Sequence, residues 1–256
     1  MAQSFPMNAW YAAAWDVDIK HALFPRMICG KHVVMYRQGN GQVTALEDAC
    51  WHRLVPLSKG RLEGDSVVCG YHGLKYNSSG RCTFMPSQET INPSACVRAY
   101  PVVERHRFVW LWMGDPAMAD PALVPDMHWN DDPAWAGDGK TIHVKCDYRL
   151  VVDNLMDLTH ETFVHGGSIG NEAVAEAPFD VAHGDKTVTV TRWMRGIEAP
   201  RFGPSNCKSR DWSIAGRSFA SRRPAPSTSM SGWRRPAPAR RKAIARKAST
   251  ATCSIP

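Results

Sequence analysis

The 256-residue chain contains no apolar run that approaches the roughly 18 residues needed by a membrane-spanning helix. Its first six residues also lack the charged and apolar segments of a secretory leader. These absences argue against helical membrane spans and against export. We therefore expect a soluble protein of the cytoplasm that is long enough for two domains.

Acidic residues are nearly absent from the end of the chain. Residues 201–256 hold 13 Lys or Arg and a single acid, Asp211, for a net charge of +12. Residues 1–200 hold 18 Lys or Arg and 23 Asp or Glu, for a net charge of −5. The overall charge of +7 therefore comes entirely from the last 56 residues, and the acidic body argues against a nucleic-acid-binding protein.

The eight cysteines lack the spacing of a disulfide framework, and a reducing compartment suits free thiols and metal ligands. We expect four of them to be buried as small hydrophobes, namely Cys29, Cys82, Cys96 and Cys146. Two others stand close to histidines, in Cys50-Trp51-His52 and Cys69-Gly70-Tyr71-His72.

Each of these two pairs offers one thiol and one imidazole, with 16 residues between His52 and Cys69. In a Rieske [2Fe–2S] cluster two thiolates hold one iron and two imidazoles the other, which raises the reduction potential above that of an all-cysteine cluster. A tetrahedral zinc site is the alternative, although zinc sites usually group like ligands together. The mixed pairs favour the cluster and a role in moving single electrons.

Strand signals surround the two pairs. Residues 32–37 and 42–46 are joined through Gly39-Asn40-Gly41, which predicts a β-hairpin. Residues 108–112 are aromatic or β-branched and predict a further strand. Gly70 and Gly73 flank Tyr71-His72, where we expect the backbone to approach the cluster too closely for a Cβ. This part of the chain is predicted to be all-β.

A second informative stretch runs from Asp147 to His165 and is predicted to form an amphipathic helix. Its polar face carries Asp153, Asn154, Asp157, His160 and Glu161. His160 and His165 are five residues apart and would diverge by about 140° on an ideal helix, so the helix should widen into a π-bulge or end between them.

Two histidines and a carboxylate form the facial triad of non-haem Fe(II) oxygenases. Asp157, one turn before His160, is placed to accept a ring N–H from that histidine. A solvated polar face is the commoner outcome for such a helix. The upstream cluster motif is what favours iron here.

Residues 7 to about 200 resemble the oxygenase components of the vanillate O-demethylase family. The resemblance rests on Asn8-Ala9-Trp10-Tyr11, Cys50-Trp51-His52-Arg53 with Pro56-Leu57-Ser58, Cys69-Gly70-Tyr71-His72-Gly73-Leu74, and Asp153-Asn154-Leu155-Met156-Asp157-Leu158-Thr159-His160 followed by Val164-His165. Trp51 stands where the family usually has proline, without loss of a ligand.

The resemblance implies a set of metal ligands and partners. Cys50 and Cys69 would bind one cluster iron, His52 and His72 the other, and His160 and His165 a mononuclear Fe(II). Asp157, with Asn154 as the second catalytic candidate, would carry electrons from a neighbouring subunit's cluster within a homotrimer. A flavin/[2Fe–2S] reductase would supply the electrons. With O2, the methoxy group of vanillate or a similar small aromatic acid would give a phenol and formaldehyde.

Two other functions remain open. A ring-hydroxylating dioxygenase would share both metal sites. A non-catalytic Rieske electron carrier would share only the cluster. Carriers of bc-type cytochrome complexes have an additional cysteine in each pair, where this chain has Val55 and Tyr71. A small carrier would also end near residue 115.

The predicted fold class is α+β, in three parts. An all-β Rieske domain spans residues 7–115, and the first part of a helix-plus-antiparallel-sheet catalytic domain spans 116–200. A basic Ser/Pro/Arg-rich tail spans 201–256. We identify no third iron ligand after residue 165, so we expect this truncated form to be inactive.

The tail has two interpretations. It has few apolar residues at the spacing of a helix or of a strand, which suits a disordered basic arm that binds acidic partners. A frameshift is the alternative: residues 211–219 and 241–256 can be encoded so that one common offset yields strings resembling strands of the vanillate demethylase family. We favour the frameshift because both strings need the same offset.

Overall fold

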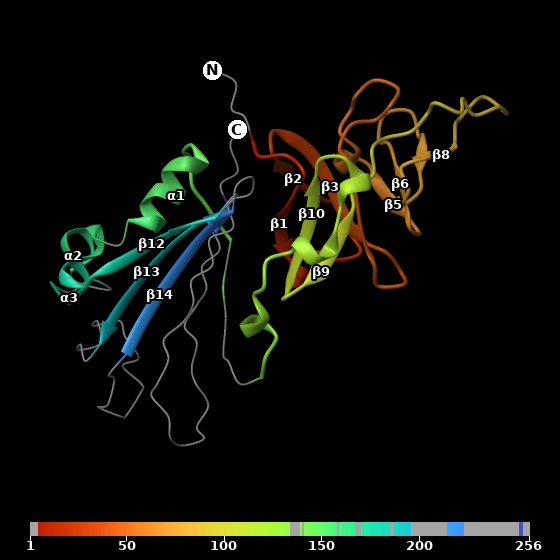
Figure 1. Cartoon of the computed structure of the whole chain (residues 1–256). Coiled ribbons are helices and arrows are strands. Elements are labelled where there is room, and N and C mark those ends of the chain that lie inside the picture. The colour runs from red at the N-terminus through yellow and green to blue at the C-terminus, as the bar shows by residue number, and fades with distance from the viewer. Residues whose placement is uncertain are drawn as a thin grey trace. The chain divides into compact units, whose positions relative to one another are not determined.

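The computed structural model describes residues 5–133, 139, 141–157, 159–166, 170, 172–184, 187–195, 214–222 and 251–252. It divides into two compact units, the first reaching Pro125 and the second beginning at Asp126 (Figure 1). The first unit continues past residue 115 because two short 3-10 helices follow its last strand. The indole N–H of Trp10 holds the second of them by donating to the carbonyl of Asp120 at 2.8 Å.

The first unit consists of antiparallel sheets with the strand orders β1-β10-β9, β2-β3-β4 and β5-β6-β7-β8. The strands are β1 (Ala9–Trp15), β2 (Phe24–Ile28), β3 (Lys31–Arg37), β4 (Val43–Glu47), β5 (Arg61–Glu63), β6 (Ser66–Val68), β7 (Lys75–Tyr76), β8 (Cys82–Phe84), β9 (Val102–Arg105) and β10 (Phe108–Met113). The 3-10 helices are η1 (Asp16–Asp18), η2 (Leu57–Lys59), η3 (Pro116–Met118) and η4 (Pro121–Leu123). The prediction of an all-β first domain is confirmed.

The predicted hairpin is the β3–β4 pair. Arg37 lies opposite Val43, and the turn is closed by a hydrogen bond from the N–H of Gln38 to the carbonyl of Gln42 at 2.8 Å. Gly41 adopts a φ of +90°, which glycine reaches without strain. All six residues of β10 are buried, as its aromatic sequence predicts.

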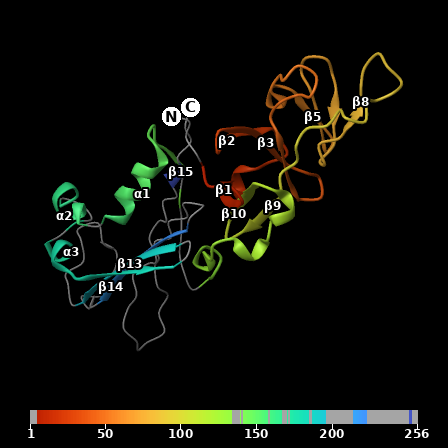
Figure 2. The ribbon, with the colours of Figure 1, turned by 45° about the horizontal axis from the view of Figure 1, so that its top comes forward.

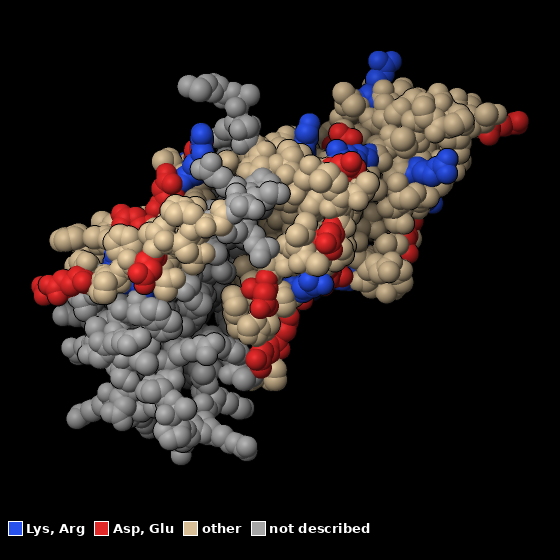
Figure 3. Space-filling view, in the orientation of Figure 1, with Lys and Arg blue, Asp and Glu red and all other residues tan. Residues whose placement is uncertain are grey.

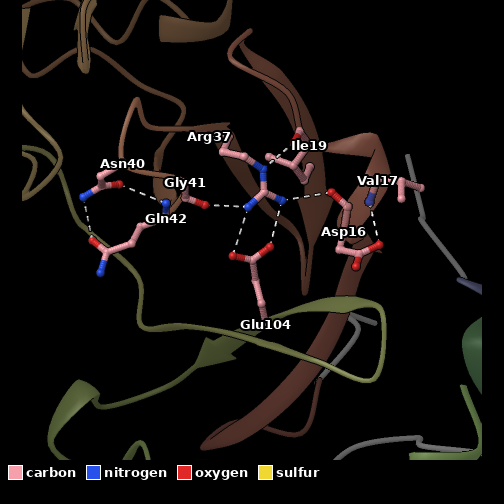
Figure 4. Close-up of polar contacts among 8 residues, drawn as sticks. All are labelled: Asp16, Val17, Ile19, Arg37, Asn40, Gly41, Gln42 and Glu104. Atoms are coloured by element: carbon pink, nitrogen blue, oxygen red, sulfur yellow. Dashed lines mark hydrogen bonds and ion pairs between the residues drawn. The ribbon is translucent and has the colours of Figure 1, made fainter. Parts of the chain in front are cut away.

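Arg37, the last residue of β3, joins this hairpin to two other segments (Figure 4). Its guanidinium donates to the backbone carbonyls of Ile19 at 3.0 Å, Asp16 at 3.0 Å and Gly41 at 2.6 Å. It also meets both carboxylate oxygens of Glu104 in β9, at 2.7 and 3.1 Å. A single side chain therefore ties the β2-β3-β4 sheet to the β1-β10-β9 sheet.

Two apolar clusters fill the first unit. One contains Cys50 and Cys69 together with residues such as Tyr36, Leu57 and Tyr76. The other lies among β1, β2, β3 and β10. The expectation that four further cysteines are buried is met by Cys82 alone. Cys29 and Cys146 are half-buried, and Cys96 is exposed.

The second unit combines short helices with an antiparallel sheet of order β12-β13-β14, as predicted. Its elements are η5 (His128–Asn130), β11 (Ile142–His143), α1 (Tyr148–Met156), α2 (His160–Val164), α3 (Glu172–Glu176), β12 (Phe179–His183), β13 (Thr187–Arg195), β14 (Ile214–Arg222) and β15 (Ala251–Thr252). Strands β11 and β15 form a parallel pair. The three α-helices lie on the same side of the sheet (Figures 1 and 2).

Strands β14 and β15 fall within residues 201–256, the predicted tail. The remainder of that segment lies outside the described residues, so the disordered or shifted tail stays a prediction. In the described part of the chain, no helix has the length and apolar character to span a membrane.

Candidate metal centres

Two loops with the same hydrogen-bond pattern carry the predicted cluster ligands. In the first cluster loop, residues 50–55, the N–H of Cys50 donates to Val55 O at 2.9 Å and the N–H of Leu54 donates to Cys50 O at 2.8 Å. The second cluster loop, residues 69–74, has the same two bonds. The N–H of Cys69 donates to Leu74 O at 2.8 Å, and the N–H of Gly73 donates to Cys69 O at 3.1 Å. Two tight turns therefore present the cysteines in equivalent positions, whereas His52 is the third residue of its loop and His72 is the fourth.

The fifth residue of each loop has a positive φ, +57° at Leu54 and +75° at Gly73. Glycine reaches this conformation readily, whereas leucine is strained in it. The need for a left-handed turn explains Gly73. The expected approach of Gly70 to a cluster stays a prediction, and a Cβ there would also meet the carbonyl oxygen of Lys59, in the preceding segment, at 3.0 Å.

The structure places the four predicted ligands on the two cluster loops. Cys50 and Cys69 are buried in the apolar cluster beneath the loops. His52 and His72 are exposed, and their Nδ1 atoms lie 3.1 Å apart with ring centroids 4.7 Å apart. Two thiols thus lie on the inner side of the loops and two imidazole nitrogens on the outer side.

This donor set fits a [2Fe–2S] cluster with one iron bound by thiolates and the other by imidazoles. Burial raises the pKa of the Cys50 thiol, against an opposing effect of the Tyr76 hydroxyl 3.2 Å from its Sγ. A thiolate has no proton to donate, so with iron bound the Tyr76 hydroxyl would be the donor.

Apolar side chains surround the exposed imidazoles. Trp51, Leu54 and Tyr71 are all exposed, and the Tyr71 ring lies 3.8 Å from the His72 ring between centroids. Trp51 is therefore exposed at the surface, while both cysteines stay buried.

The predicted second centre lies on α1 and α2. The rings of His160 and His165 are 5.4 Å apart between centroids, and Asn154 Nδ2 lies 3.3 Å from His160 Nε2. Helix α2 ends at Val164, and His165 has left the helical conformation with φ −116° and ψ 19°. The predicted end of the helix between the two histidines is confirmed, and it brings both imidazoles to one place.

The predicted continuous helix and the predicted contact of the Asp157 carboxylate were wrong. Helix α1 stops at Met156, and Asp157 caps it with an extended ψ of 97°. The backbone carbonyl of Asp157, not its carboxylate, contacts His160 Nδ1. The carboxylate instead accepts the N–H of Thr159 at 2.9 Å, at the start of α2. Because the chain turns between the helices, residues 157 and 160 do not share a helical face.

Buried polar residues near both centres were missed from the sequence. Tyr76 and Asp48 lie beneath the cluster loops, and Glu161 and Arg192 are buried in the second unit. Arg192 reaches Thr159 Oγ1 at 3.3 Å and lies over the ring of Phe179. Most charged residues of α1 to α3 are acidic, and acidic side chains are visible on this part of the molecule in Figure 3.

Among the described residues, no three His, Cys, Asp or Glu side chains gather closely enough to hold a single metal ion. His160 and His165 are thus a pair of candidate ligands. Two acids further along the chain are available as a third ligand. Asp180, on β12, is exposed, and Asp185 lies outside the described residues.

Two family profiles match the chain. The Rieske [2Fe-2S] domain matches residues 9–101, and the vanillate O-demethylase oxygenase C-terminal domain matches residues 144–250. The first match includes all four cluster ligands, and the second includes His160 and His165. A match to the Rieske domain favours the cluster over the zinc site.

The chain is 44% identical to the vanillate O-demethylase oxygenase subunit of Pseudomonas sp. (strain HR199 / DSM 7063), over 77% of this chain and 56% of that relative. It is 47% identical to the toluene-4-sulfonate monooxygenase system iron-sulfur subunit TsaM1 of Comamonas testosteroni, over 74% of this chain and 56% of that relative. The crystal structure of dicamba monooxygenase bound to dicamba matches with a TM-score of 0.76 and 34% identity, over 86% of this chain and 65% of that one. The chain spans little more than half the length of these curated relatives.

Proposed function

Since the chain belongs to the Rieske non-haem iron oxygenases, in the vanillate O-demethylase oxygenase family, we propose that it is the oxygenase component of an aromatic O-demethylase. The observation that carries this proposal is the presence of two convergent ligand sets in one chain. Cys50, His52, Cys69 and His72 form the first, and His160 and His165 form the second. A pure electron carrier needs only the first set.

The residues of each centre have distinct tasks. Cys50 and Cys69 would hold one cluster iron below the surface, while His52 and His72 would hold the other at the surface. A bound cluster supplies single electrons, and a bound ferrous ion supplies the place of O2 activation. The Asp157 carbonyl contacts Nδ1 of His160 and so orients the ring. Asn154 Nδ2 would have to leave its 3.3 Å contact with Nε2 before that nitrogen could bind a metal.

Asn154 and Asp157 border His160, so we assign them to the route by which electrons reach that histidine. In a homotrimer the donor would be the cluster of a neighbouring subunit, since such head-to-tail contacts close into a ring. A flavin/[2Fe–2S] reductase would reduce the cluster again after each electron transfer.

The proposed reaction balances as a monooxygenation. An aryl methyl ether, O2, two electrons and two protons give a phenol, formaldehyde and water. Hydroxylation of the methyl carbon forms a hemiacetal, whose C–O bond then breaks. Relatives named for vanillate, toluene-4-sulfonate and dicamba all take their names from aromatic acids, so we propose a methoxylated benzoate, with vanillate first.

The proposal extends to the reading frame of the last 56 residues. We infer a one-base shift near codon 201 from the abrupt change of charge there. The observations that oppose a shift are the C-terminal profile match to residue 250 and the position of β14. On the frameshift proposal, the third iron ligand belongs to sequence that this frame does not encode.

Two measurements test the proposal. The purified 256-residue chain should contain iron and labile sulfide in the ratio of a [2Fe–2S] cluster, and on reduction should give the rhombic EPR signal of a nitrogen-ligated centre. Stoichiometric zinc without sulfide would contradict the cluster.

For the activity, frame-corrected protein is given reductase, NADH, Fe(II) and vanillate, with the 256-residue chain as the control. Formaldehyde should appear with the corrected protein alone. A cis-diol product would assign the chain to the ring-hydroxylating dioxygenases. Robust formaldehyde release by the uncorrected chain would refute the frameshift.

A further inference from the structure

The two cluster loops differ in how their ends are joined. The second cluster loop connects β6 directly to β7, and the pairing of Val68 with Lys75 closes its base. The first cluster loop follows β4, which pairs with β3, and leads through η2 into β5, which pairs with β6. Among the strand pairings of the described residues, none joins β4 to β5. The backbone bond from Cys50 N–H to Val55 O closes the first loop itself, but its flanking segments are not joined by strand pairing.

Asp48 and Ser58 make that connection. Asp48 directly follows β4, is 6% exposed, and is anchored by its own N–H to the carbonyl of His32 in β3 at 3.0 Å. Its Oδ1 accepts the backbone N–H of Ser58 at 2.6 Å, and its Oδ2 accepts the Ser58 hydroxyl at 2.6 Å. Hydrogen bonds to a carboxylate are about twice as strong as those between neutral groups. Both oxygens of a buried acid are thus bound to one residue on the far side of the first cluster loop.

The segment after Ser58 is fixed against the second cluster loop by close backbone contact. A Cβ on Gly60 would lie 2.0 Å from Val68 O, and a Cβ on Gly70 would lie 3.0 Å from Lys59 O. A side chain at Gly60 would overlap the backbone, and one at Gly70 would be tightly placed against it. A displacement of Ser58 is therefore transmitted directly to the backbone that precedes and follows Cys69.

We propose that Asp48 is a positioning residue for the cluster. Acting through Ser58, it sets the spacing of the two cluster loops and hence the separation of His52 from His72. The inference rests on the proposed [2Fe–2S] cluster and concerns a residue that lies outside the ligand set. Without the carboxylate, the segments that flank the first cluster loop lose their connection to each other, which alters the geometry in which the loop presents its ligands.

The test compares Asp48→Asn with Glu104→Gln in the full 256-residue chain. Glu104 makes the matched control because it is a carboxylate that accepts two bonds from one partner, Arg37, in the same unit. Iron, labile sulfide, the EPR line shape and the rate of cluster loss under a chelator are measured for each variant. Asp48→Asn should shift or broaden the EPR signal and lose its cluster on the order of tenfold faster. Glu104→Gln should keep the wild-type spectrum and rate.

Ser58 provides an independent arm if Asp48→Asn does not fold. Ser58→Ala removes only the hydroxyl bond and should lose the cluster faster to a smaller extent, while Ser58→Thr should restore the wild-type rate. A wild-type spectrum and lifetime in both Asp48→Asn and Ser58→Ala would overturn the inference, as would equal losses in Asp48→Asn and Glu104→Gln. A wild-type chain without iron and sulfide would instead overturn the proposed function.

Discussion

At the scale of single residues, the Tyr76 hydroxyl is the polar group that meets a cluster thiol within the apolar core. Donation to a thiolate stabilises the more negative, reduced state of a cluster and raises its reduction potential. We expect Tyr76→Phe to lower the potential on the order of 60 mV, the one-electron equivalent of about 1.4 kcal/mol. A redox titration followed by EPR measures this shift.

Tyr36→Phe is the control for that prediction. Tyr36 is also buried in the cluster-bearing core, but its hydroxyl donates to the carbonyl of Asp65 at 2.8 Å. The potential of this variant should stay at the wild-type value. Equal shifts in the two variants would show that general loosening of the core, rather than the bond to Cys50, sets the potential.

Asp157 carries a second prediction at this scale. In a frame-corrected enzyme, Asp157→Asn keeps an oxygen for the N–H of Thr159, so α2 should stay in place and the cluster should remain reducible. Removal of the negative charge beside His160 should slow electron delivery to the iron. Single-turnover kinetics of cluster reoxidation with substrate and O2 measure the effect, with Asp153→Asn as the control. Wild-type reoxidation in Asp157→Asn would remove this carboxylate from the route.

At the scale of secondary-structure elements, Arg37 links two sheets of the first unit. Lysine keeps the charge but cannot donate to three carbonyls and a carboxylate in a fixed fork. We expect Arg37→Lys to lower the free energy of unfolding by about 1–2 kcal/mol. Thermal unfolding of the cluster-loaded chain measures this loss. Arg61→Lys, at an exposed ion pair with Glu63, should change stability little, and an equal loss there would contradict the role of Arg37.

The elements that the sequence predicts are those with local signals. The β3–β4 hairpin follows from alternating strand residues around a glycine turn, and β10 follows from an aromatic run. The cluster ligands also lie close together in sequence, within two short pairs, so their spacing alone identifies them.

The features that the sequence does not predict depend on contacts between distant segments. The break after Met156 depends on Asp157 turning its carboxylate to Thr159, although the helical periodicity continues through that point. The strained turn at Leu54 is set by the hydrogen bonds of its loop, since leucine gives no signal for positive φ. Asp48 and Ser58 meet across the first cluster loop, and although Ser58 belongs to the family motif, nothing in the sequence pairs it with Asp48.

At the scale of the whole molecule, the change in charge after residue 200 separates an acidic body from a basic end. If a one-base shift produced that end, the corrected frame should stay open and should encode ordinary apolar patterning with an acidic iron ligand. Sequencing the gene around codon 201 tests this directly. Stop codons throughout the alternative frame would contradict the shift and would return the basic segment to consideration as a functional arm.

The face-to-face approach of Gly60 and Gly70 also limits how this domain can change during evolution. A larger residue at either position meets backbone, and backbone cannot change its rotamer to make room. A Cβ on Gly60 would overlap a main-chain oxygen that every residue type carries, so no substitution elsewhere relieves that contact, and a Cβ on Gly70 would be tightly placed. We expect fewer amino-acid substitutions at these two positions than at the exposed residues of the cluster loops. The same should hold in descendants that act on a different substrate.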